Sequence, residues 1–341
     1  MAVDLAALRE KAKFLHGEGW EKQYWMVVRH LAKTDVLAYG LWVHGEEFAL
    51  AGRAAEAKHL QAAASVMEGH KKTVFIWPPE HFKTTLLQWE MEQWIGAETE
   101  RHFLEKGHPA PSAAFVMNTA SQSEKLCMLM AATFEANDRY KALFPHVEPS
   151  PKHGWTKSEL FLKRRAQRKD PTLLACGMFG PVQGFRFGKI SLDDPVDQQD
   201  ARSDKIMDQQ IAWVLGVLDD RLLEGGTQRV ALTLWGKKGI GNTLLASEEW
   251  ESVVFPCYGQ SPKYGTRLWP DAFPDYPWGK VLWPEEWNEE RLEAKRRSKQ
   301  LVEGGDLWTL AYLANPTPPE GNLFRKAWFQ YEPAPVMPIA A

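Results

Sequence analysis

The amino-acid sequence predicts an α/β fold with a mostly parallel central sheet that helices cover on both faces. Short β-rich apolar runs alternate along the chain with stretches whose apolar residues recur at helical spacing, which is typical of parallel sheets. Three of these runs lead into polar pairs or single polar residues at the ends where such sheets place their ligands. With 341 residues, 44% of them hydrophobic, the chain can form one large domain or two smaller ones.

The N-terminal region, residues 1–70, is expected to be helical and to pack on the rest of the chain. Its apolar spacing predicts three helices, the last one closed by Gly69: Leu5–Leu15, Lys22–Leu31 and Arg53–Met67. Three tryptophans of this region, Trp20, Trp25 and Trp42, are expected to pack in the core.

The stretch around which the chain is organised begins with the apolar strand Thr73–Trp77, which two prolines stop at once. A helical pattern follows over Thr84–Trp94, so Lys83 and Thr84 come at a helix start. Free N–H groups at a helix start favour an anion, Lys adds a positive charge, and a Thr hydroxyl can bind Mg²⁺. Eight consecutive residues are therefore predicted to hold the phosphates of a nucleotide: Pro78, Pro79, Glu80, His81, Phe82, Lys83, Thr84 and Thr85.

Both glycines of the usual phosphate-loop pattern are missing from this stretch, where Trp77 and Phe82 take their places. Considered alone, the stretch leaves open an ordinary strand, loop and helix with an exposed lysine. Two later strands favour the phosphate-binding interpretation.

Those strands end in groups that nucleotide hydrolysis needs. Gly188–Pro195 contains Asp193 and Asp194 directly before a proline that stops the strand. Because side chains alternate along a strand, Asp193 is expected to face the helix start and the metal, and Asp194 the γ-phosphate and the attacking water. A cap on the next turn is the alternative for Asp194. The strand Arg229–Leu234 carries Thr233 where a γ-phosphate sensor would stand.

The remaining pattern completes a core over residues 71–250. It predicts two further strands and two helices: Ala113–Thr119, Gln122–Ala136, Leu173–Met178 and Asp204–Leu223. Ser121 and Glu124 have the spacing of a capping box at the start of the first helix, and Gly225-Gly226 are expected to end the second.

Together these motifs resemble the ATPase part of the large subunit of tailed-phage terminases, the motor that drives DNA into a capsid. The family's loop Pro-Pro-Arg-His-Gly-Lys-Ser is matched by residues 78–84, and its Asp-Asp-Pro strand end by residues 193–195. Its coupling motif Thr-Arg-Trp is matched by residues 233–235. Leu282–Trp287 and Gly321–Trp328 also resemble its connecting region.

The chain departs from the family pattern at three positions: Glu80 replaces a basic residue, Phe82 replaces Gly, and Leu234 replaces Arg. Since two of these changes remove a basic residue near the nucleotide, a neighbouring subunit is expected to supply the arginine that stabilises the transferring phosphate. Arg139 and Arg186 are both candidates, and the sequence does not choose between them.

The resemblance implies an ATP-hydrolysing, Mg²⁺-dependent motor that translocates double-stranded DNA. It implies a homo-oligomeric ring on a capsid portal, with a terminase small subunit as partner, in the cytoplasm of the infected host cell. His59 and Gln61 become candidates to hold the adenine, and the junction before the helix Gln122–Ala136 is expected to face DNA. The implied roles are as follows: Lys83 binds the β/γ-phosphates, Thr84 and Asp193 hold Mg²⁺, Asp194 orients the attacking water, and Thr233 couples hydrolysis to motion.

After residue 250 the periodicity is lost except over Glu289–Leu301, and prolines and tryptophans crowd the sequence. Residues 251–341 are therefore expected to form a connecting extension packed on the core. Large subunits of the resembling family carry a nuclease after this region, for which no room remains here. We expect no DNA cleavage by this chain, with the nuclease truncated or on a separate chain.

Charge and cysteine content limit the partners. A net charge of −3 gives no overall attraction to nucleic acid, so DNA contacts must come from local patches. Two basic runs, residues 163–169 and 295–299, fit either solvated helix faces or phosphate contacts. Cys127, Cys176 and Cys257 lack metal-ligand spacing and are expected to be buried thiols. No 18-residue apolar run appears, so no membrane partner is expected.

Two other functions remain open from the sequence. A helicase-like DNA-dependent ATPase would share the motifs, and a non-catalytic scaffold could carry a degenerate phosphate loop. Unwinding of a forked duplex would identify the first, and failure to bind nucleotide would identify the second.

Overall fold

The computed structural model describes residues 3–46, 50–165, 168–236, 238–258, 281–300 and 307–315, with Gln300 described by its backbone only. The resemblance at Gly321–Trp328 and the residues after it lie outside the described residues. Among the described helices, none combines the length and apolar character needed to cross a bilayer.

Seven strands form one sheet in the order β3-β4-β2-β5-β6-β1-β7. All neighbouring pairs are parallel except β3 with β4. The predicted α/β class with a mostly parallel sheet is therefore confirmed. The strands are β1 (Lys72–Ile76), β2 (Ala113–Met117), β3 (Glu159–Leu160), β4 (Leu173–Gly177), β5 (Phe187–Asp193), β6 (Leu222–Leu232) and β7 (Glu251–Val254).

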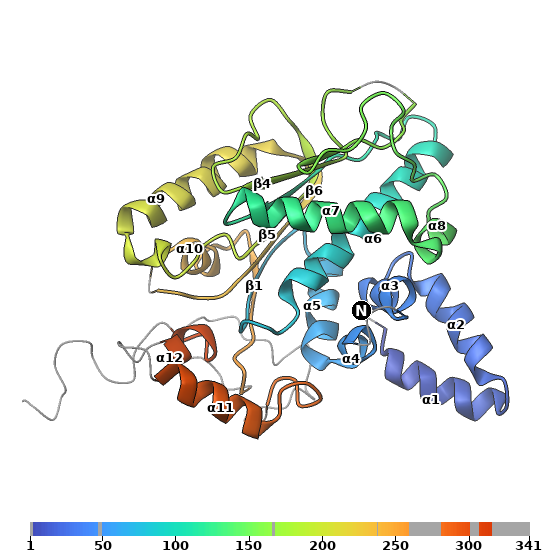
Figure 1. Ribbon diagram of the computed structural model, residues 1–341, viewed down its shortest axis with the longest axis horizontal. Helices are drawn as coiled ribbons and strands as arrows, with labels where there is room; N and C mark the ends of the chain where they lie inside the picture. Colours follow the sequence, from blue (N-terminus) through green and yellow to red (C-terminus); the bar gives the residue numbers. More distant parts are fainter. Residues whose placement is uncertain are drawn as a thin grey trace, which may run out of the picture.

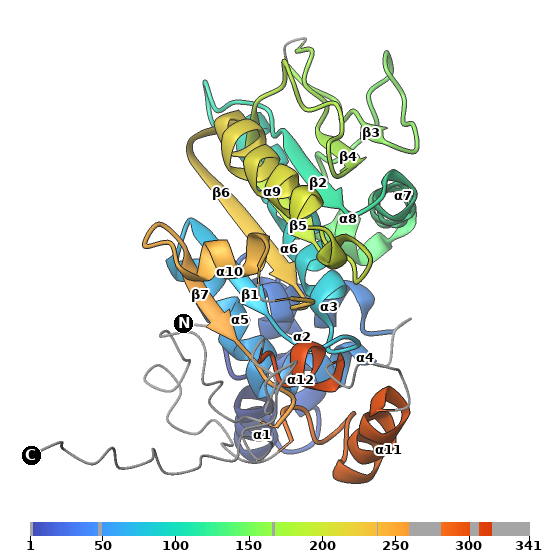
Figure 2. The same ribbon diagram turned by 90° about the vertical axis from the view of Figure 1, so that its left-hand side faces the viewer.

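Helices cover both faces of this sheet, because the central strands are apolar on both sides. Phe75 and Phe115 point into one core with α6 (Lys83–Leu104) and α7 (Ala120–Ala136). Val74 and Val116 point into the other core with α9 (Asp204–Trp213) and α10 (Ile240–Leu245). Figures 1 and 2 show these two layers on opposite sides of the strands.

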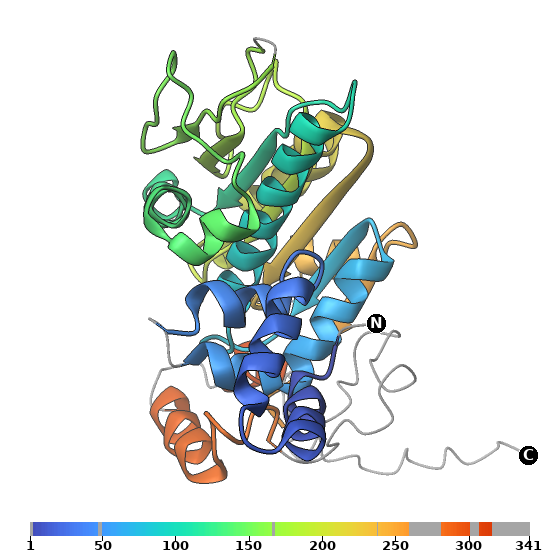
Figure 3. The same cartoon turned by 90° about the vertical axis from the view of Figure 1, so that its right-hand side faces the viewer.

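The N-terminal region is helical, as expected, and its helices gather on one side of the molecule (Figure 3). They are α1 (Leu5–His16), α2 (Trp20–Leu31), α3 (Val36–His44), α4 (Leu50–Glu56) and α5 (Lys58–Gly69). The sequence pattern did not predict α3. The expectation of one helix over Arg53–Met67 was wrong, because the helix is broken at Ala57, whose backbone is extended. α3 packs closely on α6, since a Cβ at Gly40 would lie 2.0 Å from the Trp89 ring.

The start of α7 also corrects the prediction. The helix begins at Ala120, so its N-cap is Thr119 and the capping box joins Thr119 to Gln122, not Ser121 to Glu124. The Thr119 hydroxyl accepts from the Gln122 backbone N–H, and the Gln122 side chain accepts from the Thr119 N–H. α8 (Asp138–Leu143) follows directly.

The helix predicted over Asp204–Leu223 is shorter than expected. α9 ends at Trp213, a π turn spans Val214–Leu218, and one 3₁₀ turn precedes β6. Gly225-Gly226 do not end a helix; they lie within β6. Gly225 has φ of 78°, and a Cβ at Gly226 would come within 2.9 Å of the Gly188 carbonyl oxygen, so both serve the irregular pairing of β6 with β5.

The sheet continues past residue 250, because β7 pairs parallel with β1. Beyond it, the helix expected over Glu289–Leu301 is confirmed in the described residues as α11 (Glu289–Gln300). α11 and α12 (Leu307–Ala311) pack below the loop that joins β1 to α6 (Figure 1). The Cys257 N–H donates to Tyr312 O at 2.8 Å, and Leu282 N–H donates to Cys257 O at 2.8 Å. All three cysteines are buried, as predicted.

Candidate active site

The predicted phosphate loop, residues 78–85, runs from the carboxyl end of β1 into the first turn of α6. β6 lies between β1 and β5, so the ends of these three strands are neighbours at one edge of the sheet. The sheet thereby brings together five side chains that the sequence singled out from three separate stretches: Lys83, Thr84, Asp193, Asp194 and Thr233. We refer to these five residues as the Lys83 cluster.

Lys83 is the centre of this cluster, and its side chain is only 4% exposed. Its Nζ donates to Thr233 Oγ1 at 2.9 Å and to the Pro78 carbonyl oxygen at 3.2 Å. The Asp194 carboxylate lies 3.5 Å away. A buried ammonium held by neutral oxygens and one carboxylate is suited to receive an anion, because a phosphate would replace weak acceptors with a charged one.

Asp193 lies at the last position of β5, is fully buried, and accepts from the Thr84 hydroxyl at 2.6 Å. Burial raises the pKa of this carboxyl to about 7, and the neighbouring Asp194 adds to the effect, while Thr84 and Lys83 oppose it. Its second oxygen, Oδ1, is buried without a hydrogen-bond partner among the described residues. A buried carboxylate with one unpaired oxygen is the kind of group that a cation would complete.

Asp194 turns away from its neighbour, because its backbone adopts φ of 39°. Its Oδ1 accepts from the Thr233 N–H at 2.8 Å, and its side chain is 41% exposed. The two carboxylates therefore point to different places, one into the protein and one toward solvent beside Lys83. This hydrogen bond joins Asp194 to the residue that follows β6 and not to the turn after Asp194. The alternative of a turn cap therefore does not describe this contact.

The loop backbone takes left-handed turns without glycine. Glu80 has φ of 62° and Phe82 has φ of 77°. For a residue other than glycine, the left-handed conformation costs roughly 1–2 kcal/mol. Phe82 is 8% exposed, and its ring packs edge-on against Trp89 with centroids 5.0 Å apart. Burial of an aromatic ring offsets the strain at this position.

A segment from the other end of the chain, residues 281–300, packs on the same loop. Trp287 stacks on His81 with centroids 5.4 Å apart and an interplanar angle of 8°, and its indole N–H donates to Glu80 O at 3.2 Å. Lys295 Nζ lies 2.7 Å from the Glu80 carboxylate. Burial lowers the pKa of His81 to about 4, so this imidazole is neutral at pH 7. No local pattern in the sequence indicated these contacts; only the resemblance of Leu282–Trp287 to a connecting region drew attention to the segment.

The two arginine candidates lie elsewhere. On α8, Arg139 donates to Trp42 O at 3.0 Å, pairs with Glu46 and lies over the Trp42 ring. Arg186 precedes the amino end of β5, at the sheet edge opposite the cluster, and donates to Asp220 O at 2.8 Å. Within the described part of the chain, neither guanidinium contacts the Lys83 cluster. A role for either toward a neighbouring subunit stays a prediction.

The candidates for adenine contact are both buried. His59 lies among aromatic rings, and its ring centroid is 5.4 Å from that of Trp283. Burial lowers the pKa of His59 to about 3. Gln61 donates to Ala55 O at 3.3 Å. Their suggested contact with adenine stays a prediction.

The donors of the cluster fit Mg²⁺. Thr84 Oγ1 and the free oxygen of Asp193 are hard oxygen ligands, which Mg²⁺ prefers together with phosphate oxygens and water. The described residues contain no group of three or more His, Cys, Asp or Glu suited to a metal on their own.

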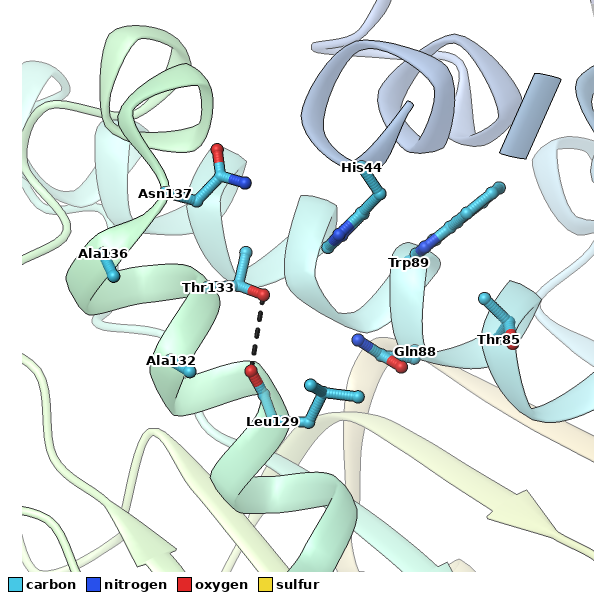
Figure 4. Close-up of a pocket in the computed structure, with 9 residues that line it drawn as sticks. All are labelled: His44, Thr85, Gln88, Trp89, Leu129, Ala132, Thr133, Ala136 and Asn137. Carbon is cyan, nitrogen blue, oxygen red and sulfur yellow. Dashed lines mark hydrogen bonds between the residues drawn. The ribbon is translucent and has the colours of Figure 1, made fainter. Parts of the chain in front are cut away.

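A cavity of about 420 Å³ has none of the five cluster residues among its described lining residues, which Figure 4 shows. It opens between α6 and α7, and Thr85, next to Thr84, is one of its walls. Its described lining residues include no lysine, arginine or carboxylate, so it is less suited to phosphate than the Lys83 cluster. The lining residues are His44, Thr85, Gln88, Trp89, Leu129, Ala132, Thr133, Ala136 and Asn137.

Comparison with known proteins finds distant similarity in structure alone. No protein-family model matches the sequence, and no curated protein is significantly similar to it. A variant of the large terminase ATPase domain of Thermus phage P74-26 is 13% identical, with a TM-score of 0.44, over 75% of this chain and 93% of that one. The crystal structure of the large terminase of bacteriophage HK97 is 12% identical, with a TM-score of 0.42, over 74% of this chain and 48% of that one. These proteins are of the kind that the sequence motifs resemble, but similarity at this level assigns no function, which therefore rests on the Lys83 cluster.

Proposed function

We propose that this chain hydrolyses ATP at the Lys83 cluster. The observation that carries the proposal is the meeting of three strand ends, where Lys83 Nζ lies 2.9 Å from Thr233 and 3.5 Å from Asp194, while Thr84 binds Asp193 at 2.6 Å. A buried lysine, a helix start, a metal-binding pair and a separate exposed carboxylate are the groups that phosphoryl transfer to water requires.

Each group has a distinct task in this reaction. On ATP binding, Lys83 exchanges its contacts with Thr233 and Pro78 for oxygens of the β- and γ-phosphates. Thr84 and Asp193 hold Mg²⁺, which supplies positive charge to the phosphate oxygens. Asp194 orients a water molecule and accepts its proton as the oxygen–phosphorus bond forms and the bond to the ADP oxygen breaks. ADP and inorganic phosphate are the products.

Thr233 is placed to link the γ-phosphate to the sheet. Its hydroxyl accepts from Lys83, and its backbone N–H donates to Asp194, so it contacts both groups that would touch the γ-phosphate. Because Lys83 leaves Thr233 for the phosphates when ATP binds, loss of the γ-phosphate would let this contact form again beside the Asp194 hydrogen bond. This is the physical basis for proposing that Thr233 couples hydrolysis to motion.

We further propose, from the motifs of the sequence, that the ATPase is the motor of a terminase large subunit. In that role it moves double-stranded DNA into a capsid as a homo-oligomeric ring on a portal, with a small subunit as partner. The nuclease belongs to a separate chain or to a further part of the same protein. An arginine of a neighbouring subunit, Arg139 or Arg186, supplies charge to the transition state.

Nucleotide binding and turnover test the proposal together. A fluorescent ATP analogue should bind in the presence of Mg²⁺. If a neighbouring subunit completes the site, the rate of phosphate release per subunit should rise with protein concentration. Absence of binding would support a scaffold, and turnover per subunit that stays constant on dilution would rule out an arginine supplied in trans. Movement along an unforked duplex without strand separation distinguishes a packaging motor from a helicase.

A further inference from the structure

A second cavity, of about 400 Å³, lies at the far end of the molecule from the Lys83 cluster. It is bounded by the loops on either side of β3, beside the C-terminal end of α6. α6 has 22 residues and begins at Lys83, so the two sites are separated by roughly 30 Å of helix. Figure 2 shows β3 and its loops at the end opposite α11 and α12.

The lining of this cavity is strongly basic, and none of its described lining residues is acidic. Its positively charged residues are Lys152, Lys163, Arg164, Arg165 and Arg168. The whole chain carries a net charge of −3, so this accumulation is local. The described residues of the basic run, 163–165 and 168–169, are irregular rather than helical, so they do not form the solvated helix face that was one interpretation of this run.

Most of the cations here have no ion-pair partner among the described residues. Arg164 donates to the Asp170 carbonyl oxygen at 2.6 Å and to the Thr172 hydroxyl at 2.9 Å. Arg165 donates to carbonyl oxygens at the end of α6. These acceptors are neutral, so they fix the guanidinium groups without cancelling their charge. Only Lys163 has an ion-pair partner among the described residues, an exposed one with Glu148.

Two cations are left without such contacts. Lys152 and Arg168 are exposed, and within the described part of the chain neither side chain makes a hydrogen bond or an ion pair. Burial lowers the pKa of Arg164; Asp170 opposes this change, and the positive charge of Arg168 adds to it. The guanidinium groups of Arg164 and Arg168 therefore repel each other across the cavity, and an anion between them would relieve the repulsion.

We propose that this basic cavity binds a phosphate group, held by the fixed guanidinium of Arg164 and by Lys152 and Arg168. The planar guanidinium of Arg164 in a set position suits phosphate oxygens, and the exposed Lys152 and Arg168 add positive charge. The phosphate can belong to the backbone of a DNA duplex or be free in solution. The chemistry is the same for both, and it does not depend on ATP hydrolysis at the Lys83 cluster.

The test uses the full chain with the double substitution Lys152→Gln and Arg168→Gln. Both side chains are exposed, so the fold should be unaffected, which circular dichroism can check. Lys11→Gln with Lys22→Gln is the matched control, since it removes the same charge from exposed positions on α1 and α2. Binding of a labelled duplex is measured over a KCl series, and binding of inorganic phosphate by calorimetry.

If the duplex is the source, the double variant should bind it about tenfold more weakly at low salt. The negative slope of the logarithm of the binding constant against the logarithm of salt concentration should become less steep by about two. If free phosphate is the source, only the calorimetric signal should be lost. Either result supports the site. The proposal is overturned if both signals match the wild type or if the control loses as much. DNA-free ATP turnover should stay unchanged in the double variant, so loss of the proposed ATPase and loss of this site are separate outcomes.

Discussion

The two halves of the phosphate loop are built differently. The half that leads into α6 is polar, and its partners are strand ends of the core: Lys83 and Thr84 contact Thr233 and Asp193. The half before it, residues 80–82, is packed by aromatic rings, and its partners Trp283, Trp287 and Lys295 come from the last described segments.

The difference shows how a loop can keep its shape without the usual glycines. Where the proposed chemistry would take place, the expected residue types are present. Where only the backbone path matters, Glu80 and Phe82 take left-handed conformations that are supported by stacking and an ion pair from another segment. The function of the first half should therefore depend on single side chains, and that of the second half on packing.

Lys83→Ala gives the strongest test of this contrast. The negative charge of the transition state is spread over the phosphate oxygens, so removing a buried cation beside them should lower ATP turnover by a factor of about 10² to 10³ or more. Lys295→Ala is the matched control, because Lys295 touches the same loop from outside, and it should change turnover only a few-fold. Phosphate release measures both. Equal losses in the two variants would remove the distinction between the halves.

The two carboxylates should fail in different ways. Asp194→Asn keeps its size and can still face the loop but cannot accept a proton, so Mg²⁺-ATP should bind normally while turnover falls by about 10² or more. Asp193→Asn should instead raise the Mg²⁺ concentration needed for turnover. Binding and phosphate release across a Mg²⁺ series separate the two effects. Wild-type turnover of Asp194→Asn would place the catalytic base elsewhere.

Asp193 should also make stability depend on pH in metal-free buffer. Its folded-state pKa is raised to about 7, so between pH 4 and 7 the folded protein holds a proton that the unfolded chain has released. This group therefore lowers the free energy of unfolding as the pH rises through that window, by up to about 4 kcal/mol. Asp193→Asn should be more stable than the wild type at pH 7.5, and the difference should disappear near pH 4. Denaturant melts at a series of pH values measure it, and a constant difference would contradict the assignment.

Trp287→Ala tests the packed half. Loss of a buried indole should reduce the free energy of unfolding by about 3 kcal/mol. Because His81 loses its stacking partner and Glu80 O its hydrogen bond, KM for ATP should rise more than kcat falls. Trp20→Ala is a control on a partly buried tryptophan far from the loop, and it should leave KM unchanged. A pure loss of kcat would mean that this half takes part in the chemistry.

The smallest effect is expected at the strained positions themselves. Glu80→Gly relieves a left-handed conformation, worth roughly 1 kcal/mol, and loses only a partly exposed ion pair with Lys295. Its melting temperature should stay within a few degrees of the wild type. Phe82→Gly relieves similar strain but removes a buried ring, so it should be less stable than Glu80→Gly. The opposite order would show that strain outweighs packing at Phe82.

The sequence predicted those parts of the structure that repeat a local pattern. β1, β2, β4 and β5 lie within two residues of their expected positions, and Lys83, Thr84, Asp193, Asp194 and Thr233 meet as the strand-end argument requires. Failures arose where tertiary contacts decide. α3 has apolar residues all round, so it lacks the one-sided pattern of a surface helix, and Gly225-Gly226 look like a helix stop but serve a strand irregularity. The contacts of Trp287 and Lys295 with a loop some 200 residues earlier leave no local pattern.

The position of β1 within the sheet has a consequence for synthesis on the ribosome. β1 pairs only with β6 and β7, which follow it by about 150 and 180 residues. At roughly 5–20 residues per second, ten to forty seconds pass between the emergence of β1 and that of its last partner. For most of this time, until β6 has emerged, Val74, Phe75 and Ile76, which are buried in the finished protein, have no strand on either side. The nascent chain therefore carries an apolar strand that is unpaired until residue 232 has emerged and open along one edge until residue 254 has emerged, and an open apolar strand edge favours aggregation.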